Sequence, residues 1–523
     1  MKKNIFIIIT LIFVFSFKCY SQDKRGNVWI MSGSGMLATF TDTSKPILSQ
    51  LFPNMQKAFH KASSTICDSA TGKLILLCNG ATLMDTLGNI IENGDSLIPP
   101  NQYTMNTPAD GNTTQCSLIL PKGSSGLYYV FITAVTDSMF DKWFLPNATA
   151  TPADLLQFNV VDMNANGGLG KVIQKNIPLI TNNKLARVGM MACRHANGYD
   201  WWLLKQGLDT NVIFTFLVTR DTVEFKFKQV FSFPKFDLME AFGQSCFSSD
   251  GSKYAFATGG ANSGKGAQLG IADFDRCTGL LSNMKSVNVP IDSTNYWYTD
   301  SIGQKDSVTR GLSFSPNDSF LYVAKGWNIY QYEYNNPDSF QAWYLVHRYD
   351  TIAEYSLFGQ LQKGIDGRIY IGKYGGSKKF NNVINKPNIK GAGCDFCQFC
   401  LDFSAFTGAS TSPPNMPDFN LGALMPCWPL GSSEIGDKRL ETLVVYPNPS
   451  STYIDVNYEF RDKRNSTIEM YNAIGQQVYS SQLLHLRSHI SIDVRHLSKG
   501  MYYLRCLPVG QSGENEVKKV IIE

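Results

Sequence analysis

Several short segments carry residue types that could bind phosphate or act as acid and base. Residues 259–266 nearly match a phosphate-binding loop, but Gly266 stands where a Ser or Thr would hold magnesium, and a strand pattern follows instead of a helix. A hairpin loop is therefore the favoured interpretation. His485 and His489 are four residues apart in a segment without helical periodicity, so they do not predict a zinc-binding helix face. His195 precedes an Asn-Gly pair, where a structural role at a turn is favoured.

Cysteines and carboxylates at two places could hold a metal ion. Cys394, Cys397 and Cys400 have the spacing that opens an iron–sulfur motif, yet Ser404 stands at the fourth position. A zinc site would need one more soft ligand, and the nearest is the distant Cys427. In an exported chain we expect disulfides within this cluster of four cysteines instead.

Asp273 and Asp275 are spaced like calcium ligands, but two carboxylates at the end of a strand are commoner than a calcium site. We also find no Gly-x-Ser-x-Gly elbow and no His-Glu-x-x-His motif in the sequence. The local motifs therefore predict no catalytic residue, no metal and no cofactor.

The first 21 residues have the pattern of a secretory signal peptide. Lys2 and Lys3 precede an apolar stretch over residues 5–17, and a small-x-small site ends at Ser21, so cleavage is expected between Ser21 and Gln22. Thirteen apolar residues span only about 20 Å as a helix, and no later stretch approaches the length of a membrane span. Lys18 directly before Cys19 disfavours a lipid anchor. We predict no transmembrane segment in the mature protein.

Composition narrows the class of protein further. The chain has 523 residues, of which 43% are hydrophobic and 17% charged, so it can build more than one domain. Lys and Arg (47) nearly balance Asp and Glu (43), which argues against a basic nucleic-acid binder. The many glycines, tyrosines and phenylalanines (43, 24 and 33) favour an all-β fold.

One pattern repeats along the first four fifths of the chain: strand-type residues, a turn of Gly, Asn, Asp or Ser, and a second strand. The six copies are residues 65–77, 115–130, 189–202, 245–255, 312–323 and 360–371. A single hairpin of this kind buries its apolar face only when neighbours stack on it. A β-propeller solves that problem by repeating small sheets around a ring.

We therefore predict a β-propeller over residues 22–428. Seven blades give about 58 residues each and six give about 68, so seven are favoured over six, because known blades have about 40 to 50 residues. The remaining blade would combine residues 27–31 and 35–40 with a closing strand at 419–428, which would join the two ends of the ring.

A resemblance supports this architecture. It rests on Trp29, Gly33 and Gly35, on Cys67-Asp68 before Gly72-Lys73-Leu74, on residues 111–116 before Tyr128–Phe131, on His195 before Gly198–Trp202, and on the turn Phe247–Ser252. In that order these residues resemble seven-bladed propellers that occur as secreted proteins of type IX-secreting bacteria. The resemblance implies a fold and no activity.

The residue composition changes after Trp428. A polar Gly/Ser stretch, residues 429–441, predicts a linker. Residues 442–523 then alternate apolar and polar positions between turn residues, which predicts a small β-sandwich.

Four motifs stand in this module, in the order Pro447-Asn448-Pro449, Gly475 with Val478, Leu497 with Gly500 and Tyr502, and Lys518-Lys519. They resemble the type A (Por-type) C-terminal sorting domain of the type IX secretion system. One departure is the terminal Glu523, where that family often has a basic residue. An ordinary adhesive sandwich is the alternative.

The resemblance to the sorting domain implies partners and a destination. The partners would be the type IX machinery of a Gram-negative bacterium and its sortase. The module would then be removed in or near the linker, and the protein would be secreted or attached to surface lipopolysaccharide.

Asp followed by Ser or Thr and then Ala, Ile, Leu, Val, Met or Thr occurs more often than expected. It begins at Asp68, Asp85, Asp95, Asp137, Asp221, Asp292, Asp300, Asp306 and Asp350, whereas ordinary residue frequencies give about two. The motif resembles an O-glycosylation acceptor of bacteria related to those with this export route. The alternative is that Asp-Ser and Asp-Thr simply suit turns between strands.

These observations favour an exported binding protein whose loops, on one face of the ring, hold a glycan or another protein. The alternative is a propeller enzyme, a glycoside hydrolase or lyase, with carboxylates from different blades meeting at the channel mouth. A pocket in which Asp, Glu and His side chains converge would favour the enzyme. An apolar or aromatic pocket without paired carboxylates would favour binding.

Overall fold

Strands dominate the computed structural model of this protein. The structure describes residues 22–31, 35–41, 45–51, 59, 62–99, 113–123, 126–147, 151–208, 211–231, 243–258, 267–290, 308–336, 338, 341–349, 357–374, 379–408, 412–424, 440–460, 466–483, 487–508 and 517–523. In this part of the chain no helix is long and apolar enough to cross a membrane.

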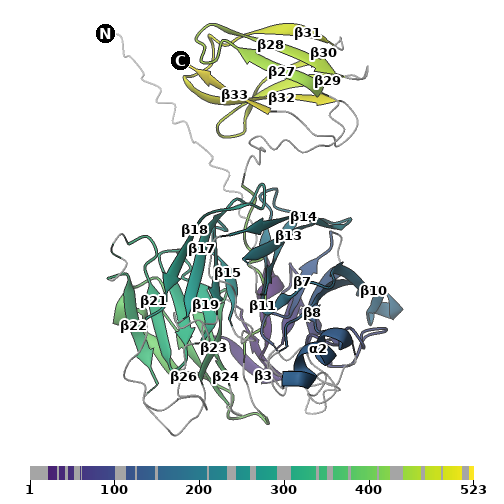
Figure 1. The fold of residues 1–523 in the computed structure, drawn as a ribbon, viewed down its shortest axis with the longest axis vertical. Helices are drawn as coiled ribbons and strands as arrows, with labels where there is room; N and C mark the ends of the chain where they lie inside the picture. Colours follow the sequence, from purple (N-terminus) through teal and green to yellow (C-terminus); the bar gives the residue numbers. More distant parts are fainter. Residues whose placement is uncertain are drawn as a thin grey trace, which may run out of the picture.

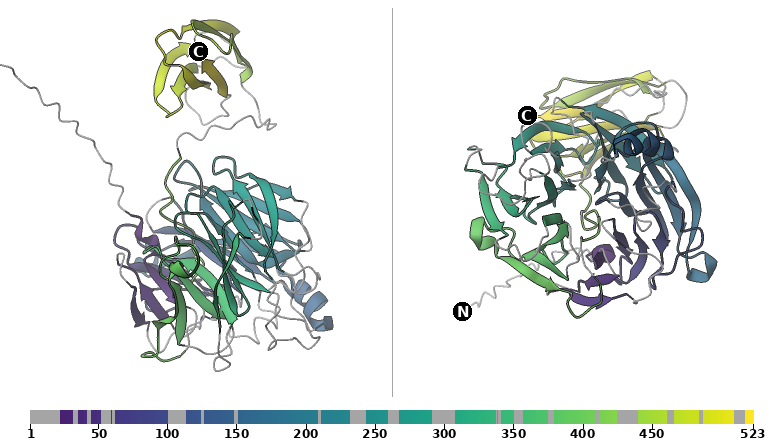
Figure 2. Two further views of the ribbon diagram at one scale, coloured as in Figure 1. Left: turned by 90° about the vertical axis from the view of Figure 1, so that its left-hand side faces the viewer. Right: turned by 60° about the horizontal axis from the view of Figure 1, so that its bottom comes forward.

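Small antiparallel sheets of three or four strands follow one another up to residue 402, and each is built from strands consecutive in the sequence. They are β1–β3 (Val28–Met31, Met36–Thr39, Ile47–Gln50), β4–β6 (Ser64–Cys67, Leu74–Cys78, Leu83–Met84), β7–β10 (Ser117–Pro121, Leu127–Ala134, Leu155–Asp162, Lys171–Ile180), β11–β14 (Leu185–Arg194, Trp201–Gly207, Val212–Val218, Val223–Val230), β15–β18 (Ser245–Phe247, Lys253–Thr258, Gln268–Phe274, Leu281–Asn288), β19–β22 (Thr309–Phe314, Leu321–Lys325, Asn328–Tyr332, Trp343–Arg348) and β23–β26 (Leu357–Lys363, Ile369–Tyr374, Phe380–Ile384, Phe396–Asp402). Helix α2 (Asp137–Asn147) connects β8 to β9 (Figure 1). The sheets succeed one another around a ring, so the arrangement is propeller-like (Figure 2).

Each of the six predicted hairpins is present as the first strand pair of its sheet. They are β4–β5, β7–β8, β11–β12, β15–β16, β19–β20 and β23–β24. Their turns use left-handed backbone where the sequence offers glycine, for example at Gly198 (φ 80°) and Gly251 (φ 73°). Local alternation and turn chemistry were therefore sufficient to find these units.

In the four-stranded sheets, burial falls from the first to the last strand. In the sheet β11–β14, nine of the ten residues of β11 are buried, whereas the outer strand β14 has no buried residue. First strands are covered on both faces because neighbouring sheets pack against them at the centre of the ring. The buried positions include polar residues such as Ser64 and Thr309 as well as apolar ones.

The ring closes by side-chain contact between its first and last sheets. Trp29 and Phe40 from the first sheet pack against Tyr370 of β24, with ring centroids 5.4 and 5.3 Å from the tyrosine ring. The side-chain nitrogen of Gln50, at the end of β3, donates to the Thr407 carbonyl at 2.8 Å.

The predicted closing strand at 419–428 is wrong for its described part. Residues 412–424 form no strand, and β3 completes the first sheet instead. In the described part, residues 419–424, the carbonyls of Phe419 and Gly422 accept from the side chains of Arg194 and Arg276 and not from a neighbouring strand. Residues 425–428 lie outside the described part of the chain.

Residues 412–424, which we call the strap, run through the centre of the ring. The Asn415 side chain donates to the carbonyls of Ser117 (2.9 Å) and Met190 (3.2 Å), which belong to the first strands β7 and β11. Its oxygen accepts from Gln115, whose amide also exchanges two hydrogen bonds with Ser245 of β15. In the right-hand view of Figure 2 this segment is the green chain inside the ring.

The C-terminal part of the chain is a separate pair of sheets. One is β27 (Leu440–Tyr446), β28 (Tyr453–Phe460) and β31 (Arg487–Asp493), and the other is β30 (Gln477–Leu483), β29 (Ser466–Asn472), β32 (Gly500–Pro508) and β33 (Val517–Ile522). Both sheets contribute to one apolar core, with Ile454 and Val456 from the first and Ile468, Leu504 and Val520 from the second. This is a small β-sandwich, and its first strand begins at Leu440, inside the predicted linker.

Candidate functional site

A cavity of about 450 Å³ lies at the centre of the ring. The first strands β11, β15, β19 and β23 and the turns that follow them form one part of its wall, and strap residues 416–421 form another. The N-terminal residues Gln22, Gly26 and Trp29 complete the lining. The volume is in the range of small-ligand pockets.

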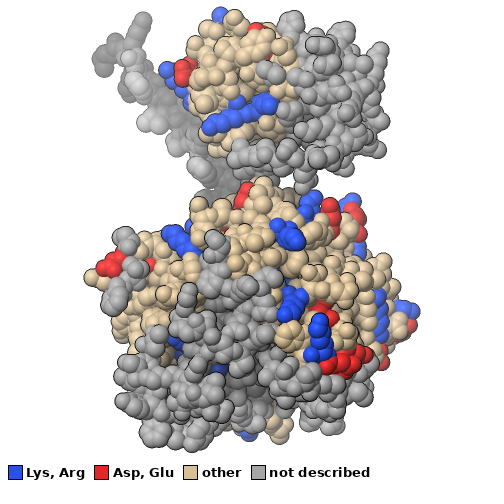
Figure 3. All heavy atoms as spheres, viewed as in Figure 1, with Lys and Arg blue, Asp and Glu red and all other residues tan. Residues whose placement is uncertain are grey.

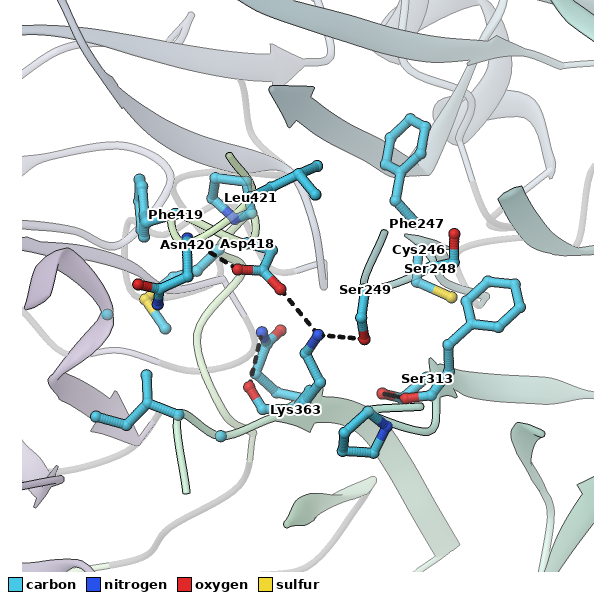
Figure 4. A pocket seen from close by; sticks show the side chains of 18 of the residues that line it. Cys246, Phe247, Ser248, Ser249, Ser313, Lys363, Asp418, Phe419, Asn420 and Leu421 are labelled. Carbon is cyan, nitrogen blue, oxygen red and sulfur yellow. Dashed lines mark hydrogen bonds and ion pairs between the residues drawn. The ribbon is translucent and has the colours of Figure 1, made fainter. Parts of the chain in front are cut away.

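Three polar side chains meet in this pocket. Lys363 ends strand β23, Ser249 lies in the turn after β15, and Asp418 belongs to the strap. The Lys363 ammonium donates to Ser249 Oγ at 2.6 Å and to the Asp418 carboxylate at 2.8 Å, and Figure 4 shows it between the two. The side chains of Lys363 and Asp418 keep 23% and 30% of their surface exposed, so this ion pair is accessible from the pocket.

The backbone around these side chains is fixed by other carboxylates. Both oxygens of Asp318 accept backbone N–H groups, from Ser249 (2.6 Å) and Asp250 (3.0 Å). Burial raises the pKa of Asp318. Burial also raises the pKa of Asp250, but the hydrogen bonds from Ser248 and Ser252 outweigh it and lower that pKa overall. Neither carboxylate lines the pocket, so both act on the turn and not on a ligand.

Apolar side chains form much of the remaining wall, among them Phe247, Phe314, Leu361, Met416 and Phe419. Two thiols also line the pocket. Burial raises the pKa of Cys193 to about 12 and raises that of Cys246 as well, so both remain neutral thiols at physiological pH. They contribute small apolar surface and not a nucleophile.

The chemistry available in the pocket follows from this inventory. Asp418 is the one carboxylate among its lining residues, and Lys363 already neutralises it. No histidine is among those lining residues. Elsewhere in the part of the chain that the structure describes, no group of three or more His, Cys, Asp or Glu residues could hold a metal ion. The pocket can offer adjacent donors and acceptors to a ligand, beside apolar walls.

Two of the described cysteines in the predicted cluster form a disulfide. Cys397 and Cys400 form a disulfide on β26. Cys394 is a free, buried cysteine, which differs from the disulfide expected for it. Burial raises its pKa, and it shares a hydrogen bond with Tyr322, so it belongs to the packing between β20 and the 3₁₀ turn η3 (Gly391–Cys394). Cys427 lies outside the described residues.

Two other groups singled out in the sequence have structural surroundings. His195 accepts the backbone N–H of Asn197 at 3.0 Å and packs on Trp202, and burial lowers its pKa. Asp273 is paired with Lys253, and Asp275 accepts hydrogen bonds from Cys277 and Thr278 in its own turn. Both groups lie outside the pocket.

The motif residues of the C-terminal module sit at the joints of the sandwich. Asn448 lies between Pro447 and Pro449, donates to the Lys519 carbonyl at 2.7 Å, and accepts the Ile521 N–H at 2.8 Å. This side chain therefore ties the entry to β28 to the last strand, β33, which also contains Lys518. The sequence motif does not reveal this role of Asn448.

The remaining motif residues are in turns or against the core. Gly475 has φ 80° in the turn between β29 and β30, where its N–H donates to Asn472. Val478 and Leu497 pack against the core, Gly500 begins β32, and the Tyr502 hydroxyl donates to the Ser498 carbonyl at 2.7 Å.

Five of the nine Asp-Ser/Thr motifs lie in the described residues. Thr86, Ser96, Ser138 and Thr222 are exposed, and Ser69 is half-buried. Asp68 and Asp85 accept backbone N–H groups within their own turns, at 2.7–3.2 Å and 2.8–2.9 Å. A turn role therefore accounts for these two aspartates, whereas it does not account for the Ser or Thr that follows.

Ser21 and the rest of the predicted leader, residues 259–266, the linker residues 429–439 and the motifs at Asp292, Asp300, Asp306 and Asp350 lie outside the described residues. On the face drawn in Figure 3, described Lys and Arg side chains lie among Asp and Glu without a large patch of one sign.

Sequence reasoning did not find Lys363, Ser249 or Asp418. Lys363 and Ser249 stand a few residues before Gly367 and Gly251, the turn glycines of two predicted hairpins. Because the first strands of a propeller converge at the centre, the residues that end them were the available signal. Asp418 had no such signal, because it belongs to the strap.

Comparison with known proteins identifies the C-terminal part of the chain. Residues 444–523 match the family model of the secretion system C-terminal sorting domain. The protein therefore carries a type IX sorting domain, which implies interaction with the type IX machinery and a secreted or cell-surface location in Bacteroidetes. No curated protein matches the chain.

Three solved structures that match the chain are distant likenesses. The extracellular domain of the one-component system BT4673 from B. thetaiotaomicron is 11% identical over 96% of this chain, with a TM-score of 0.36. The chain spans 56% of that protein's length. Hsv2 of Kluyveromyces lactis is 12% identical, with 70% of this chain and 91% of that protein covered and a TM-score of 0.34. A functionally unknown protein from Desulfotomaculum acetoxidans is 10% identical (80% and 91% covered, TM-score 0.31). At these scores the likenesses carry no argument about function.

Proposed function

We propose that this protein is an exported, non-enzymatic binding protein that holds an extracellular glycan in the central pocket of a seven-bladed β-propeller. Cleavage between Ser21 and Gln22 would remove residues 1–21 during its export. The sorting domain, residues 442–523, would then carry it through the type IX machinery to the sortase, and so to the cell surface or the medium.

The observation that carries the proposal is the composition of the pocket. Lys363, Asp418 and Ser249 present donors and acceptors next to one another within a wall of Phe, Leu and Met side chains. Sugars combine adjacent hydroxyl groups with apolar ring faces, and such a pocket is complementary to both. The ion pair suits neighbouring hydroxyls because one hydroxyl can donate to Asp418 while the next accepts from Lys363.

The same composition argues against a glycoside hydrolase. Most glycoside hydrolases use two carboxyl groups on either side of the scissile bond, one of them protonated. Among the residues that line the pocket, Asp418 is the one carboxylate, and it is paired with the Lys363 ammonium at 2.8 Å. Asp250 and Asp318 are the next carboxylates, and they hold the backbone of turns.

Seven blades are supported by the sheet order in the part of the chain that the structure describes. Each unit is assembled from consecutive strands, and the aromatic contact of Trp29 and Phe40 with Tyr370 joins the ends of the series. A glycan is preferred to a protein partner because the polar group lies inside a cavity that a globular surface cannot enter.

The test is incubation of the purified protein, residues 22–523, with immobilised polysaccharides and cell-wall polymers, recording both retained protein and released reducing ends. We expect retention without turnover, and at least tenfold weaker retention for Asp418→Asn and Lys363→Met. The matched controls are Asp395→Asn and Lys386→Met, which alter an exposed ion pair (3.6 Å) that does not line the pocket.

Release of reducing ends that Asp418→Asn abolishes would overturn the proposal in favour of the hydrolase. Retention unchanged in both pocket variants would place the glycan elsewhere. Absence of retention on every polymer would exclude the glycans tested and favour a protein ligand.

A further inference from the structure

The central pocket occupies only the later part of the first strands. On β11, β19 and β23 its lining begins at Met191, Leu312 and Leu361, and on the strap it begins at Met416. The earlier residues of these segments are not among its lining residues. The pocket therefore ends partway through the ring.

Buried amide side chains cross-link the first strands at this closed end. Gln244 Oε1 accepts the N–H groups of Leu312 (3.0 Å) and Leu361 (2.9 Å), and its nitrogen donates to the Leu361 carbonyl at 2.6 Å. Gln115 exchanges hydrogen bonds with β15, and Asn415 donates to β7 and β11. These three amides are each at most 3% exposed. A polymer chain would have to break their hydrogen bonds to pass through the centre of the ring.

The opposite end of the pocket is open. Gln22 and Asn420 at this end are exposed, and Ser249, Lys363 and Asp418 are half-buried. Ser249 lies in the turn after β15 and Lys363 ends β23, so the opening is on the side of the ring where first strands end. A ligand therefore enters from this side, and only its end can reach the closed part.

The polarity of the wall changes with depth. Leu361 lies two residues before Lys363 on β23, which places it about 7 Å deeper by the rise of a strand. Leu312 and Met416 line the same level. Gln244 is also at this level, and its oxygen already accepts two hydrogen bonds. A ligand hydroxyl here would give up its hydrogen bonds to water, whereas an apolar group would gain from leaving water.

We propose that the pocket binds the end of a glycan chain and that this end carries an apolar substituent, such as an acyl, alkyl or methyl ether group. The substituent lies against Leu312, Leu361 and Met416, and hydroxyl groups of the terminal sugar reach Lys363 and Asp418. The inference rests on the proposed glycan-binding function and narrows it to substituted chain ends.

Isothermal titration calorimetry with alkyl glycosides tests the depth profile. The purified protein, residues 22–523, is titrated with methyl, propyl and pentyl glycosides of glucose, galactose and N-acetylglucosamine, so that the apolar group grows while the sugar stays constant. In the series that binds, we expect the affinity to rise about fourfold for each CH₂ that enters the closed end. Asp418→Asn should weaken every member of that series about tenfold. An affinity that does not rise with alkyl length would overturn the proposal.

A second variant locates the alkyl group. Cys246 lines the pocket on β15, between Gln244 and the turn that holds Ser249 (Figure 4). Cys246→Leu should fill part of this space, so the rise should stop at a shorter alkyl chain than in the wild type. The matched control is Cys78→Leu, which enlarges a buried cysteine on β5 that does not line the pocket. An unchanged series in folded Cys246→Leu would place the alkyl group elsewhere and overturn the proposal. If this variant does not fold, the wild-type series still decides.

Binding through chain ends is tested on a polymer that retains the protein. Size fractions of that polymer compete with the immobilised form, and short chains should compete more strongly per unit mass because they have more ends. Equal competition per unit mass would show that the interior of the chain binds, and would overturn the proposal.

Failure of this inference differs from failure of the proposed function. Polymer retention that Asp418→Asn abolishes, without binding of any alkyl glycoside, would overturn the inference and leave glycan binding standing. A rising alkyl series without retention on any polymer would support the substituted sugar end and count against the polymers tested. Absence of both would reject the two together.

Discussion

A buried lysine in the ring gives the strongest prediction about stability. Lys205 lies on β12 with no exposed surface, and its ammonium donates to the Val188 carbonyl at 2.9 Å. Burial lowers its pKa from 10.5 to about 7. The lysine does not line the central pocket, so we regard this shift as a cost of packing and not as a sign of catalysis.

The size and sign of the effect follow from proton linkage. At ~1.4 kcal/mol per pKa unit, the shift corresponds to about 5 kcal/mol against the folded state once Lys205 is protonated in both states, below pH 7. Between pH 7 and 10.5 the unfolded chain binds this proton and the folded chain does not. The free energy of unfolding should therefore rise with pH across this window, by up to ~1.4 kcal/mol per unit, and the rise should be lost as the pH falls to 7.

Lys205→Met removes the titrating group at nearly constant length. The Val188 carbonyl then loses its donor, which costs about 1–3 kcal/mol, so we expect a net gain of about 1–3 kcal/mol at pH 7 and a smaller slope above it. Urea unfolding at pH 7 to 10, followed by tryptophan fluorescence, measures both. All eight tryptophans precede the sorting domain, so the signal does not report the unfolding of that domain. Lys386→Met at an exposed site is the control, and parallel pH curves for wild type and Lys205→Met would refute the reasoning.

Three further predictions concern other parts of the chain. Asn415→Ala should lower the free energy of unfolding of the ring by about 2–4 kcal/mol in the same urea assay, because two carbonyls on β7 and β11 lose a donor; an effect below 0.5 kcal/mol would contradict the central role of Asn415. Asn448→Ala should destabilise the sorting domain by about 1–3 kcal/mol in chemical denaturation followed by circular dichroism, and should leave the tryptophan transition of the ring unchanged. The intact mass of protein secreted by a type IX-secreting host should exceed its polypeptide mass if the exposed acceptors such as Ser96 are glycosylated, and equality would leave the turn role as the explanation of the Asp-Ser/Thr motif.

Local patterns predicted the hairpins because the information they need is local. A strand pair and its turn fall within about 15 residues, and alternation, glycine and Asn/Asp residues specify them. The sorting domain was predictable for the same reason, since its motifs are short and close to their turns.

The structure at the centre of the ring could not be predicted from local patterns. The strap has three prolines and no periodicity, so no local pattern predicts a segment that is held by single side chains such as Asn415. The pocket joins Ser249, Lys363 and Asp418, whose separations in sequence exceed 50 residues. The proximity of these three side chains depends on the closure of the whole ring, and their spacing in the sequence does not predict it. Cys394 shows the same limit, because its burial beside Tyr322, and not its spacing, decides that it stays a thiol.

The two ends of the ring-forming part of the chain are neighbours. The backbone N–H of Asp23 donates to the Asn420 side chain at 2.7 Å, so the second residue after the expected leader cleavage site and the strap are one hydrogen bond apart. A protein with adjacent ends can be circularly permuted without losing a sheet. Joining residue 424 to residue 22 by a short linker, and opening the chain in one of its outer turns, would free the position of both termini. The ring could then be displayed, fused or immobilised from its rim while its central pocket stays open.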